Sequence, residues 1–275
     1  MTGISDAPIG VFDSGIGGLT VAREIMRNLP NEQIIYFGDT ARVPYGSKTK
    51  STVVRYSEQI MRFLVTQNVK AIVIACNTAS AMAMEEISAQ AGRPVIGVVE
   101  PGAEMAALAT RTKRVGIMAT AGTVSTGSYE LAIKRRDPEI QVFSQACPIL
   151  VPLVEEGWIE DPVTEEVLRR YLKPLLDQKV DTIILGCTHY PLLRKVIRRM
   201  VGDEITLVNP AYETALSLKR VLEEEDLTRL KPIKEGTPYP YRFFVSDDAE
   251  RFKEFAQSIL PIDVRTVVRV PIEKY

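Results

Sequence analysis

The chain has 275 residues, of which 45% are hydrophobic, and its 34 Lys and Arg nearly balance its 35 Asp and Glu. This length fits one large domain or two of ordinary size, with enough apolar residues for a substantial core. The formal net charge of -1 leaves no basic excess to neutralise phosphates, which argues against a nucleic-acid partner.

The N-terminal residues and the apolar runs predict a cytoplasmic protein that does not enter a membrane. The opening MTGISDAP lacks the cationic and apolar regions of a signal peptide. The longest uninterrupted apolar run, Ala71 to Cys76, is too short to cross a bilayer. Three cysteines do not make a disulfide framework, so we expect reduced thiols that are available for chemistry.

Short apolar runs alternate with stretches of helical period through the first hundred residues. In chain order, each expected strand precedes an expected helix: Ile9 to Phe12 and Leu19 to Asn28, Ile34 to Phe37 and Lys50 to Gln67, Ala71 to Ala75 and Ala79 to Ala89, Val95 to Val99 and Gly102 to Ala109. This alternation is typical of a parallel sheet covered by helices, so we predict an α/β fold.

The pattern restarts at Arg114 to Met118 as an internal repeat. Three pairs of segments match in the same order and at nearly constant spacing: Gly10 to Ser14 with Gly116 to Thr120, Val69 to Thr78 with Val180 to His189, and Val98 to Pro101 with Leu207 to Pro210. Chance would rarely supply all three. We therefore predict two similar parallel-sheet α/β domains related by pseudo-twofold symmetry.

Prolines at matching points of the repeat, Glu100-Pro101 and Asn209-Pro210, indicate where strands end and where the hinge lies. The segment after Pro210 has no counterpart in the first copy of the repeat, so we expect it to return to the first domain. The predicted domains are residues 1–99 with 210–275, and residues 100–209.

Within that returning segment, we expect one helix followed by two strands that flank a second helix. The expected elements are a helix from Pro210 to about Glu225, a strand at Arg242 to Val245, a helix at Ala249 to Ser258 and a strand at Thr266 to Val270.

Two of the three cysteines stand at equivalent points of the repeat. Cys76 and Cys187 each end an apolar run, precede an expected helix and have polar residues after them. The ligand crevice of a parallel sheet lies at this edge, and helix N-termini there lower a thiol pKa from about 8.5. A lone cysteine is more often a small buried hydrophobe, but the repetition favours chemistry. Cys147 has no repeated partner, and we expect it to be structural.

Two thiols related by a pseudo-twofold axis can remove a proton from one face of a carbon and deliver a proton to the other. Each half also has one polar assistant that the other lacks. Asp13 ends the first strand where the repeat has Ala119, and His189 stands where the repeat has Thr78. An N-capping Asp and a surface His are the structural alternatives, and the sequence leaves them open.

Other chemistries find little support. His189 is the only histidine, which excludes a multi-histidine metal site and argues against zinc. The stretch Gly15 to Gly17 lacks the serine of a hydrolase elbow. The glycines of Asp13 to Gly18 match neither the Rossmann fingerprint nor a P-loop. They do permit close backbone approach ahead of a helix, where a carboxylate or amino group of a small substrate can bind.

These residues lie in motifs that resemble those of the glutamate racemase family, cofactor-independent enzymes that supply D-glutamate for bacterial peptidoglycan and cell-wall biogenesis. The likeness covers nearly the whole chain. It is carried by Asp13 to Gly18, Gly38-Asp39-Thr40, Pro44-Tyr45-Gly46, Cys76-Asn77-Thr78, Val151 to Glu155, Gly186 to Pro191 and Asn209-Pro210. Aspartate and hydantoin racemases share the paired cysteines but not this full set.

The resemblance implies that the active site lies in the cleft between the two domains. By matching position, Cys76 looks like the base that acts on D-glutamate, and Cys187 like the base that acts on L-glutamate. Asp13 would assist Cys76. His189, with Glu155 as its hydrogen-bond partner, would assist Cys187.

The resemblance also implies a set of substrate ligands: Asp13, Ser14, Tyr45, Gly46, Asn77, Thr78, Thr120, Thr123, Thr188 and His189. We expect no metal and no cofactor, because pyridoxal phosphate needs a Schiff-base lysine and none accompanies the cysteine motifs. The expected partners are glutamate and, since the family commonly dimerises, a second copy of the chain. The first strand starts at about Ile9, which leaves no room for the N-terminal extension of some members.

Three alternatives remain at this point. A racemase of the same superfamily would act on aspartate or a hydantoin. A periplasmic-type binding module also has two α/β halves and a hinge, but it predicts an export signal. A thiol redox protein would prefer a Cys-x-x-Cys pair, whereas these cysteines lie in separate halves.

Overall fold

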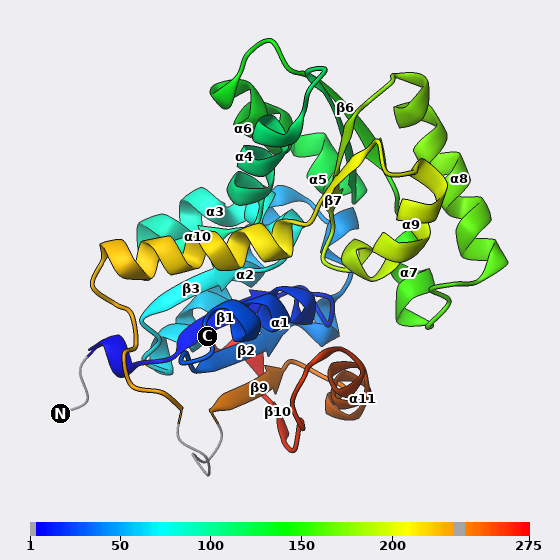
Figure 1. The fold of residues 1–275 in the computed structure, drawn as a ribbon. Coiled ribbons are helices and arrows are strands. Elements are labelled where there is room, and N and C mark those ends of the chain that lie inside the picture. The colour runs from blue at the N-terminus through cyan, green and yellow to red at the C-terminus, as the bar shows by residue number, and fades with distance from the viewer. Residues whose placement is uncertain (1–3, 234–239) are drawn as a thin grey trace.

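The computed structural model describes residues 4–233 and 240–275. It contains two parallel sheets, each covered by helices, and the chain passes from the first to the second and back again (Figure 1). We refer to the unit around the six-stranded sheet as the first domain and to the unit around the four-stranded sheet as the second domain.

The six-stranded sheet has the order β10-β9-β2-β1-β3-β4, and all of its pairings are parallel. Its strands are β1 (Ile9–Asp13), β2 (Ile34–Gly38), β3 (Ala71–Ile74), β4 (Val95–Gly97), β9 (Tyr241–Val245) and β10 (Val267–Arg269). The three central strands are buried along their whole length. Continuous apolar runs are what a parallel sheet with both faces covered requires.

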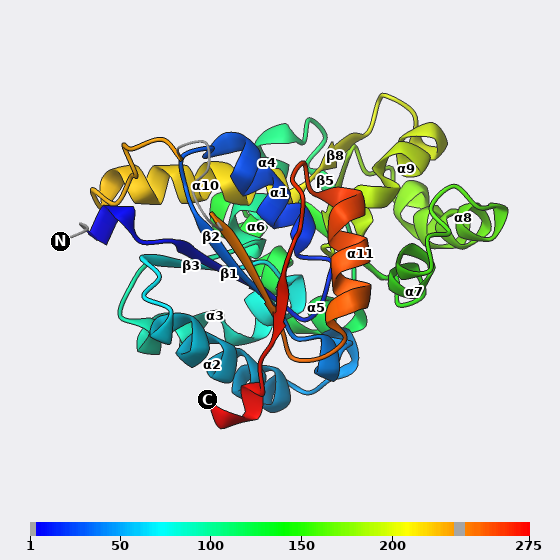
Figure 2. The ribbon, with the colours of Figure 1, turned by 90° about the horizontal axis from the view of Figure 1, so that it is seen from below.

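Helices cover both faces of this sheet (Figure 2). One face packs against α1 (Leu19–Asn28), α10 (Pro210–Glu224) and α11 (Ala249–Ile259). The other face packs against α2 (Lys50–Thr66) and α3 (Asn77–Ala91).

The second domain has the strand order β6-β5-β7-β8, again all parallel. Its strands are β5 (Arg114–Ala119), β6 (Gln141–Ala146), β7 (Thr182–Gly186) and β8 (Thr206–Val208). Helices α4 (Val99–Ala109) and α6 (Ser128–Arg136) pack on one face, and α7 (Leu150–Glu155), α8 (Pro162–Asp177) and α9 (Arg194–Val201) on the other. Helix α5 (Ala121–Thr126) follows β5.

Single-turn helices complete the described chain: η1 (Ile4–Asp6), η2 (Thr40–Arg42), η3 (Tyr45–Ser47), η4 (Tyr190–Leu193) and η5 (Ile272–Lys274). No helix in residues 4–233 and 240–275 has both the length and the apolar character needed to span a bilayer.

The strand order confirms the predicted fold class of two similar α/β domains. The order β2-β1-β3-β4 recurs as β6-β5-β7-β8, so each strand has its counterpart in the repeat. Asp13 ends β1 and Ala119 ends β5, as the sequence match requires. Cys76 and Cys187 follow the equivalent strands β3 and β7, and both therefore stand at the carboxyl edge of their sheet.

The hinge prolines differ from one another. Asn209 caps α10 and Pro210 begins it, directly after β8. The expected strand Val95 to Val99 instead ends at Gly97, and Pro101 lies in the first turn of α4. A proline is tolerated there because the first helical N–H groups have no partner within the helix. Pro101 therefore does not end a strand, and that expectation was wrong.

The C-terminal segment extends the first sheet, since β9 pairs with β2 and β10 pairs with β9. Helix α10 packs against α1 of the first domain and α4 of the second, and it crosses the molecule between them (Figure 1). Because α10 touches both domains, the sequence limits 1–99 with 210–275 and 100–209 remain a prediction.

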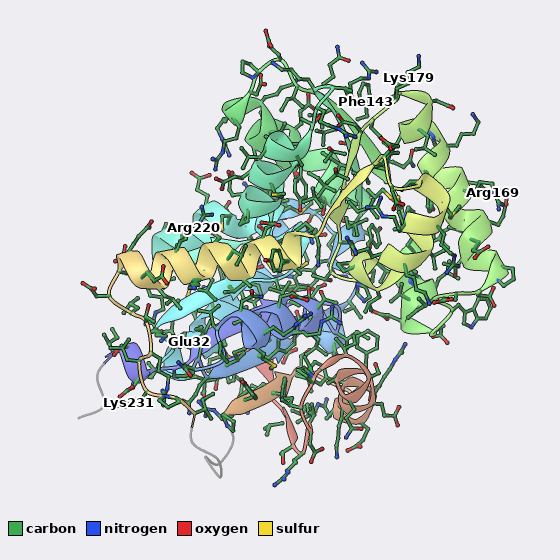
Figure 3. The ribbon with its side chains drawn as sticks, in the orientation of Figure 1. Glu32, Phe143, Arg169, Lys179, Arg220 and Lys231 are labelled. Carbon is green, nitrogen blue, oxygen red and sulfur yellow. The ribbon has the colours of Figure 1, made fainter. Side chains whose placement is uncertain are left out.

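A buried ion pair fastens the amino edge of the first sheet. Lys70 Nζ lies 2.6 Å from Glu32 Oε2, and both side chains are almost fully buried. Lys70 also donates to the carbonyls of Ser5, at 2.7 Å, and Leu227, at 2.8 Å. The pair thus ties the N-terminal segment to the segment after α10; Glu32 and the nearby Lys231 are labelled in Figure 3.

Candidate active site

Cys76 is the N-cap of α3 and is only 5% exposed. Its Sγ lies 3.5 Å from the N–H of Ala79, which it accepts, and 3.5 Å from Ser14 Oγ. Burial and the neighbouring Asp13 carboxylate raise the pKa of the Cys76 thiol to about 12, because they outweigh these hydrogen bonds. The N–H of Ala79 at the start of α3 does lower this pKa, but the net shift is upward, so the expected net lowering was wrong.

Asp13 is completely buried beside Cys76. Its Oδ2 accepts the N–H groups of Gly15 and Gly18, both at 3.0 Å. Its Oδ1 has no hydrogen-bond partner among the described residues. Burial raises the pKa of Asp13, and the His189 charge opposes that rise. Asp13 thus accepts an N–H at the start of α1, as the N-capping alternative predicts, but only through Oδ2, which leaves Oδ1 without a partner among the described residues.

Cys187 has a different polar neighbour, His189. His189 Nδ1 lies 3.8 Å from Cys187 Sγ, and His189 Nε2 lies 3.0 Å from Glu155 Oε1. His189 is 5% exposed, so the surface alternative was wrong. Burial alone would lower the pKa of His189, but the hydrogen bonds to Cys187 and Glu155 outweigh burial and raise the pKa to about 10.

The loop between Asp13 and α1 joins the two cysteine motifs. A Cβ added to Gly17 would lie 2.4 Å from Thr188 Oγ1 and 2.5 Å from His189 Nδ1. Thr20 in α1 donates to the carbonyl of Thr188 at 2.9 Å. One short loop therefore touches Cys76 through Ser14 at one end and the Cys187 motif at the other, and only glycine fits at the contact.

A second set of polar contacts crosses between the domains beside α3. Tyr129 of α6 donates to Asn77 Oδ1 at 2.6 Å. The hydroxyl oxygens of Thr78, Thr120 and Thr123 form a triangle with sides of 2.9, 3.2 and 3.0 Å. These predicted ligands from both domains are thus brought together, and they lie close to Cys76 because Asn77 and Thr78 follow it directly.

The turn at Tyr45 and Gly46 reaches the same region. A Cβ on Gly46 would lie 2.7 Å from Thr120 Cβ, so the turn lies against α5. Tyr45 is 1% exposed, and its hydroxyl donates to the carboxylate of Asp39. Because the Tyr45 hydroxyl is already hydrogen-bonded to Asp39, it is the backbone of this turn that could contact a ligand.

Sequence reasoning missed several residues that support the site. Tyr129 and Arg251 carried no signal, because their contacts join segments far apart in the chain; Arg251 Nη2 lies 3.8 Å from Glu155 Oε2. Asp39 belonged to a recognisable motif, but its role became visible only through Tyr45.

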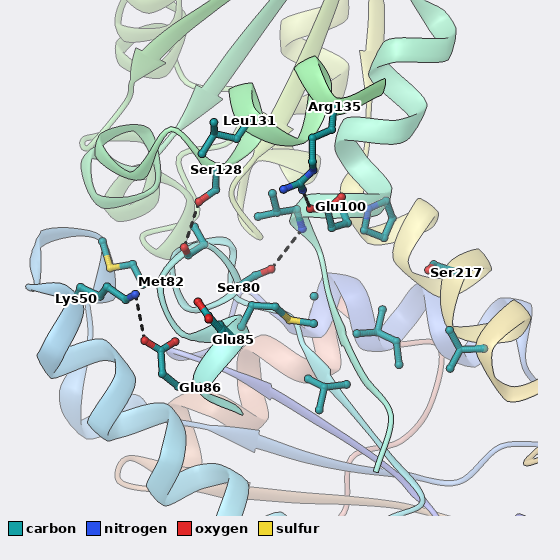
Figure 4. A pocket seen from close by; sticks show the side chains of 18 residues that line it. Lys50, Ser80, Met82, Glu85, Glu86, Glu100, Ser128, Leu131, Arg135 and Ser217 are labelled. Atoms are coloured by element: carbon teal, nitrogen blue, oxygen red, sulfur yellow. Dashed lines mark hydrogen bonds and ion pairs between the residues drawn. The ribbon is translucent and has the colours of Figure 1, made fainter. Parts of the chain in front are cut away.

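A cavity of about 400 Å³ lies elsewhere at the domain junction, among α3, α4, α6 and α10 (Figure 4). Two ion pairs border it, Lys50 with Glu86 and Arg135 with Glu100. None of the predicted site residues lines this cavity, so it is separate from the cysteine site. Within the described residues, no three His, Cys, Asp or Glu side chains are grouped as metal ligands would be.

Comparison with known sequences gives consistent matches. The profile of the family described as Asp/Glu/Hydantoin racemase matches residues 9–215. A glutamate racemase of Geobacter metallireducens is 48% identical over 265 residues, which cover 96% of this chain and 97% of that protein. A glutamate racemase of Neisseria meningitidis is 49% identical over 254 residues, which cover 92% of each chain.

Solved structures agree. Glutamate racemase from Francisella tularensis in complex with D-glutamate has a TM-score of 0.90 at 37% identity and covers 98% of this chain and 100% of its own. The enzyme from Thermus thermophilus in complex with beta-chloro-D-alanine has a TM-score of 0.87 at 40% identity, with 98% and 99% covered. This chain therefore belongs to the Asp/Glu/Hydantoin racemase family and is an amino-acid racemase, an isomerase.

Proposed function

We propose that this protein interconverts L-glutamate and D-glutamate without a cofactor, using Cys76 and Cys187 as the two proton-transferring groups. The observation that carries the proposal is the pair of buried thiols at equivalent strand ends. One lies beside Asp13 and the other beside His189, and a single loop touches both motifs. The relatives at 48–49% identity are glutamate racemases, which supports glutamate over aspartate.

The two thiols have different polar neighbours, and we assign them different roles in the reaction from L-glutamate. Cys76, with its raised pKa, is a thiol that can deliver a proton. Cys187 Sγ lies 3.8 Å from His189 Nδ1, and we assign to it the removal of the α-proton of L-glutamate. Delivery by Cys76 to the opposite face then forms D-glutamate, and the reverse reaction exchanges the two roles.

Asp13 and His189 complete the proton balance. After one turnover from L-glutamate, Cys187 carries the substrate proton and Cys76 is a thiolate. Resetting therefore needs one proton from solvent and the release of another to solvent. The free Oδ1 of Asp13 can take up a solvent proton and pass it to Cys76, while His189, held by Glu155, can release its proton to solvent and then accept the proton of Cys187. Each assistant thus resets the thiol beside it.

The α-proton of an amino acid is a weak acid, so its removal needs fixed hydrogen-bond donors for the developing negative charge. Ser14 and Asn77, the hydroxyls of Thr78, Thr120, Thr123 and Thr188, and the free N–H groups at the start of α3 can supply donors to the two substrate carboxylates. We assign Tyr45 and Gly46 to the same role through their backbone.

Substrate entry needs movement. Cys76 and Cys187 are 5% and 6% exposed, so glutamate reaches the two thiols only when the domains separate. Closure around the substrate then expels water and strengthens each polar contact.

The test is incubation of the purified protein with L-glutamate and with D-glutamate, with no cofactor added, followed by chiral chromatography. We expect both to reach an equal mixture, while L-aspartate and a hydantoin remain essentially unchanged. Faster conversion of aspartate or the hydantoin, or no conversion of glutamate, contradicts the proposal.

We further propose that the protein acts in the cytoplasm as a homodimer and supplies D-glutamate for peptidoglycan. Analytical ultracentrifugation at micromolar concentration should give twice the chain mass of 30.6 kDa. Depletion in the producing cell should cause loss of cell shape that added D-glutamate reverses. A monomer contradicts the homodimer assignment. A loss of cell shape that D-glutamate does not reverse contradicts the supply of D-glutamate.

A further inference from the structure

Asp39 is a completely buried carboxylate that the reaction described above does not use. It follows β2 directly, and its N–H donates to the carbonyl of Asp13 at 3.1 Å. It therefore stands at the carboxyl edge of the first sheet, one strand away from the Asp13–Cys76 pair. A buried charge at this position needs partners to be tolerated.

Both oxygens of Asp39 are occupied by side chains from different segments. Arg42 Nε donates to Oδ1 at 3.0 Å and to Oδ2 at 2.7 Å. Ser246 Oγ donates to Oδ1 at 2.8 Å, and the Tyr45 hydroxyl donates to Oδ2. We refer to Asp39, Arg42 and Ser246 as the Asp39 cluster.

Helix α2 holds the cation of this cluster in place. Arg42 Nη1 donates to Gln59 Oε1 at 2.5 Å, and the guanidinium lies 4.0 Å from the centre of the Tyr56 ring. The Tyr56 and Tyr45 rings are themselves 5.7 Å apart. Arg42 is thus fixed by a carboxylate, an amide and an aromatic face at once, which limits the positions open to Tyr45.

The third member, Ser246, directly follows strand β9. The Ser246 N–H donates to the carbonyl of Gly38 at 3.1 Å, and its Oγ accepts the N–H of Ala41 at 2.8 Å. Next to it, Asp247 and Thr40 exchange hydrogen bonds, with the Asp247 N–H 2.9 Å from Thr40 Oγ1. Segment 39–42 is therefore fastened along its length to a segment about 200 residues later in the chain.

These contacts hold the segment that leads into the turn at Tyr45 and Gly46. Tyr45 packs in the same apolar cluster as Cys76. Gly46 lies against Thr120, and its carbonyl oxygen would be 2.9 Å from a Cβ on Gly122. The turn thus stands between the Cys76 side of the first domain and α5 of the second.

We propose that the Asp39 cluster is a set of positioning residues that fixes the turn at Tyr45 and Gly46 for substrate binding, with Ser246, the residue after β9, contributing to this task. The inference rests on the proposed function in taking glutamate as the substrate. None of the three residues touches the reacting carbon. Loss of any one of them should weaken the binding of substrate and transition state equally. This raises KM and leaves kcat unchanged.

The test uses Ser246→Ala and Tyr45→Phe, each of which removes one hydrogen bond to Asp39 and adds no bulk. We expect KM to rise by about threefold to tenfold in each variant, the scale of the net contribution of one ordinary hydrogen bond, with kcat within about twofold of wild type. Because the enantiomers have equal free energy, kcat/KM must fall by the same factor in both directions. Ser258→Ala, which removes a hydroxyl bonded only to Phe255 in α11, should leave both constants unchanged.

A merely structural role gives a different pattern, since a smaller folded fraction lowers apparent kcat and leaves KM unchanged. That pattern, or unchanged kinetics in both variants, overturns the inference. In the double variant, the two effects should be less than additive, because both act through Asp39. If the wild-type protein fails to racemise glutamate, both the proposed function and the choice of glutamate as substrate are contradicted. If the wild-type protein racemises glutamate but KM is unaltered in the variants, only the positioning role of the Asp39 cluster is contradicted.

Discussion

The two thiols differ most at the scale of single residues, although the fold gives them equivalent positions. Burial raises the pKa of the Cys76 thiol, and the neighbouring Asp13 carboxylate adds to that rise. Cys187 has a histidine whose pKa is raised by contacts with Cys187 itself and Glu155, against the effect of burial. In the proposed mechanism, the repeat provides two thiols for the two faces of a carbon, and the residues that differ between its copies give each thiol its own role.

The first prediction concerns the thiols. Cys76→Ala and Cys187→Ala should each lower the racemisation rate by a factor of at least about 10²–10⁴, the usual contribution of a positioned acid or base. Cys147→Ala is the matched control, since the Cys147 thiol is buried and, among the described residues, hydrogen-bonds only to the carbonyl of Gln145. Its kcat should stay near that of wild type. Near-normal interconversion by either of the first two variants contradicts the two-thiol assignment.

The second prediction concerns His189, whose NMR signals need no assignment because the chain has one histidine. Its imidazole should titrate near the pKa of about 10, and Glu155→Gln should lower that pKa by removing a hydrogen-bonded negative charge. Since the folded pKa exceeds the unfolded value of about 6.5, the associated stability is present below pH 6.5 and is lost as pH rises toward 10. An unchanged His189 pKa in Glu155→Gln would refute the pairing.

Whole elements show what the sequence reveals and what it hides. Alternation of apolar runs and helical periods predicted β1 to β5 and most of their helices, because strands buried on both faces carry a strong pattern. Strand β6 was not predicted, since Gln141–Ala146 is an edge strand with an exposed and half-buried polar pattern. The repeat placed both cysteines at strand ends. It did not reveal Asp39 with Ser246 or Asn77 with Tyr129, which are contacts between distant segments.

The third prediction concerns the loop before α1. Gly17→Ala would put a Cβ 2.4 Å from Thr188 Oγ1, so the loop and the Cys187 motif must move apart. We expect kcat/KM to fall by about 100-fold, the scale of a 1 Å displacement at a reacting centre. Gly92→Ala is the contrasting control. It meets nothing within 4 Å but has a φ of +62°, so it should cost about 1 kcal/mol of stability and no activity. Equal kinetics in both variants would show that the loop does not join the two motifs.

At the scale of the whole molecule, Lys70 holds the N-terminal segment and the segment after α10 at the amino edge of the first sheet. Lys70→Met should destabilise the protein by about 3–5 kcal/mol, because it leaves the Glu32 carboxylate buried without its cation. Lys70→Met/Glu32→Leu should recover much of that loss. Thermal unfolding measures both, and kcat should stay unchanged in each. A double variant less stable than Lys70→Met alone would contradict this explanation.

The exchange of solvent deuterium tests the central claim most directly, because two bases on opposite faces impose a definite isotope pattern. Wild-type protein is incubated with protiated L-glutamate in D2O, and both enantiomers are separated and analysed by mass spectrometry after less than one tenth of the conversion. The D-glutamate formed should carry deuterium at Cα from the first turnover, since the thiol that delivers the proton has exchanged with solvent, while the remaining L-glutamate keeps protium. Protium retained in the early D-glutamate would mean that one group shuttles the proton between faces, and the assignment of Cys76 and Cys187 to opposite sides of the substrate would fall.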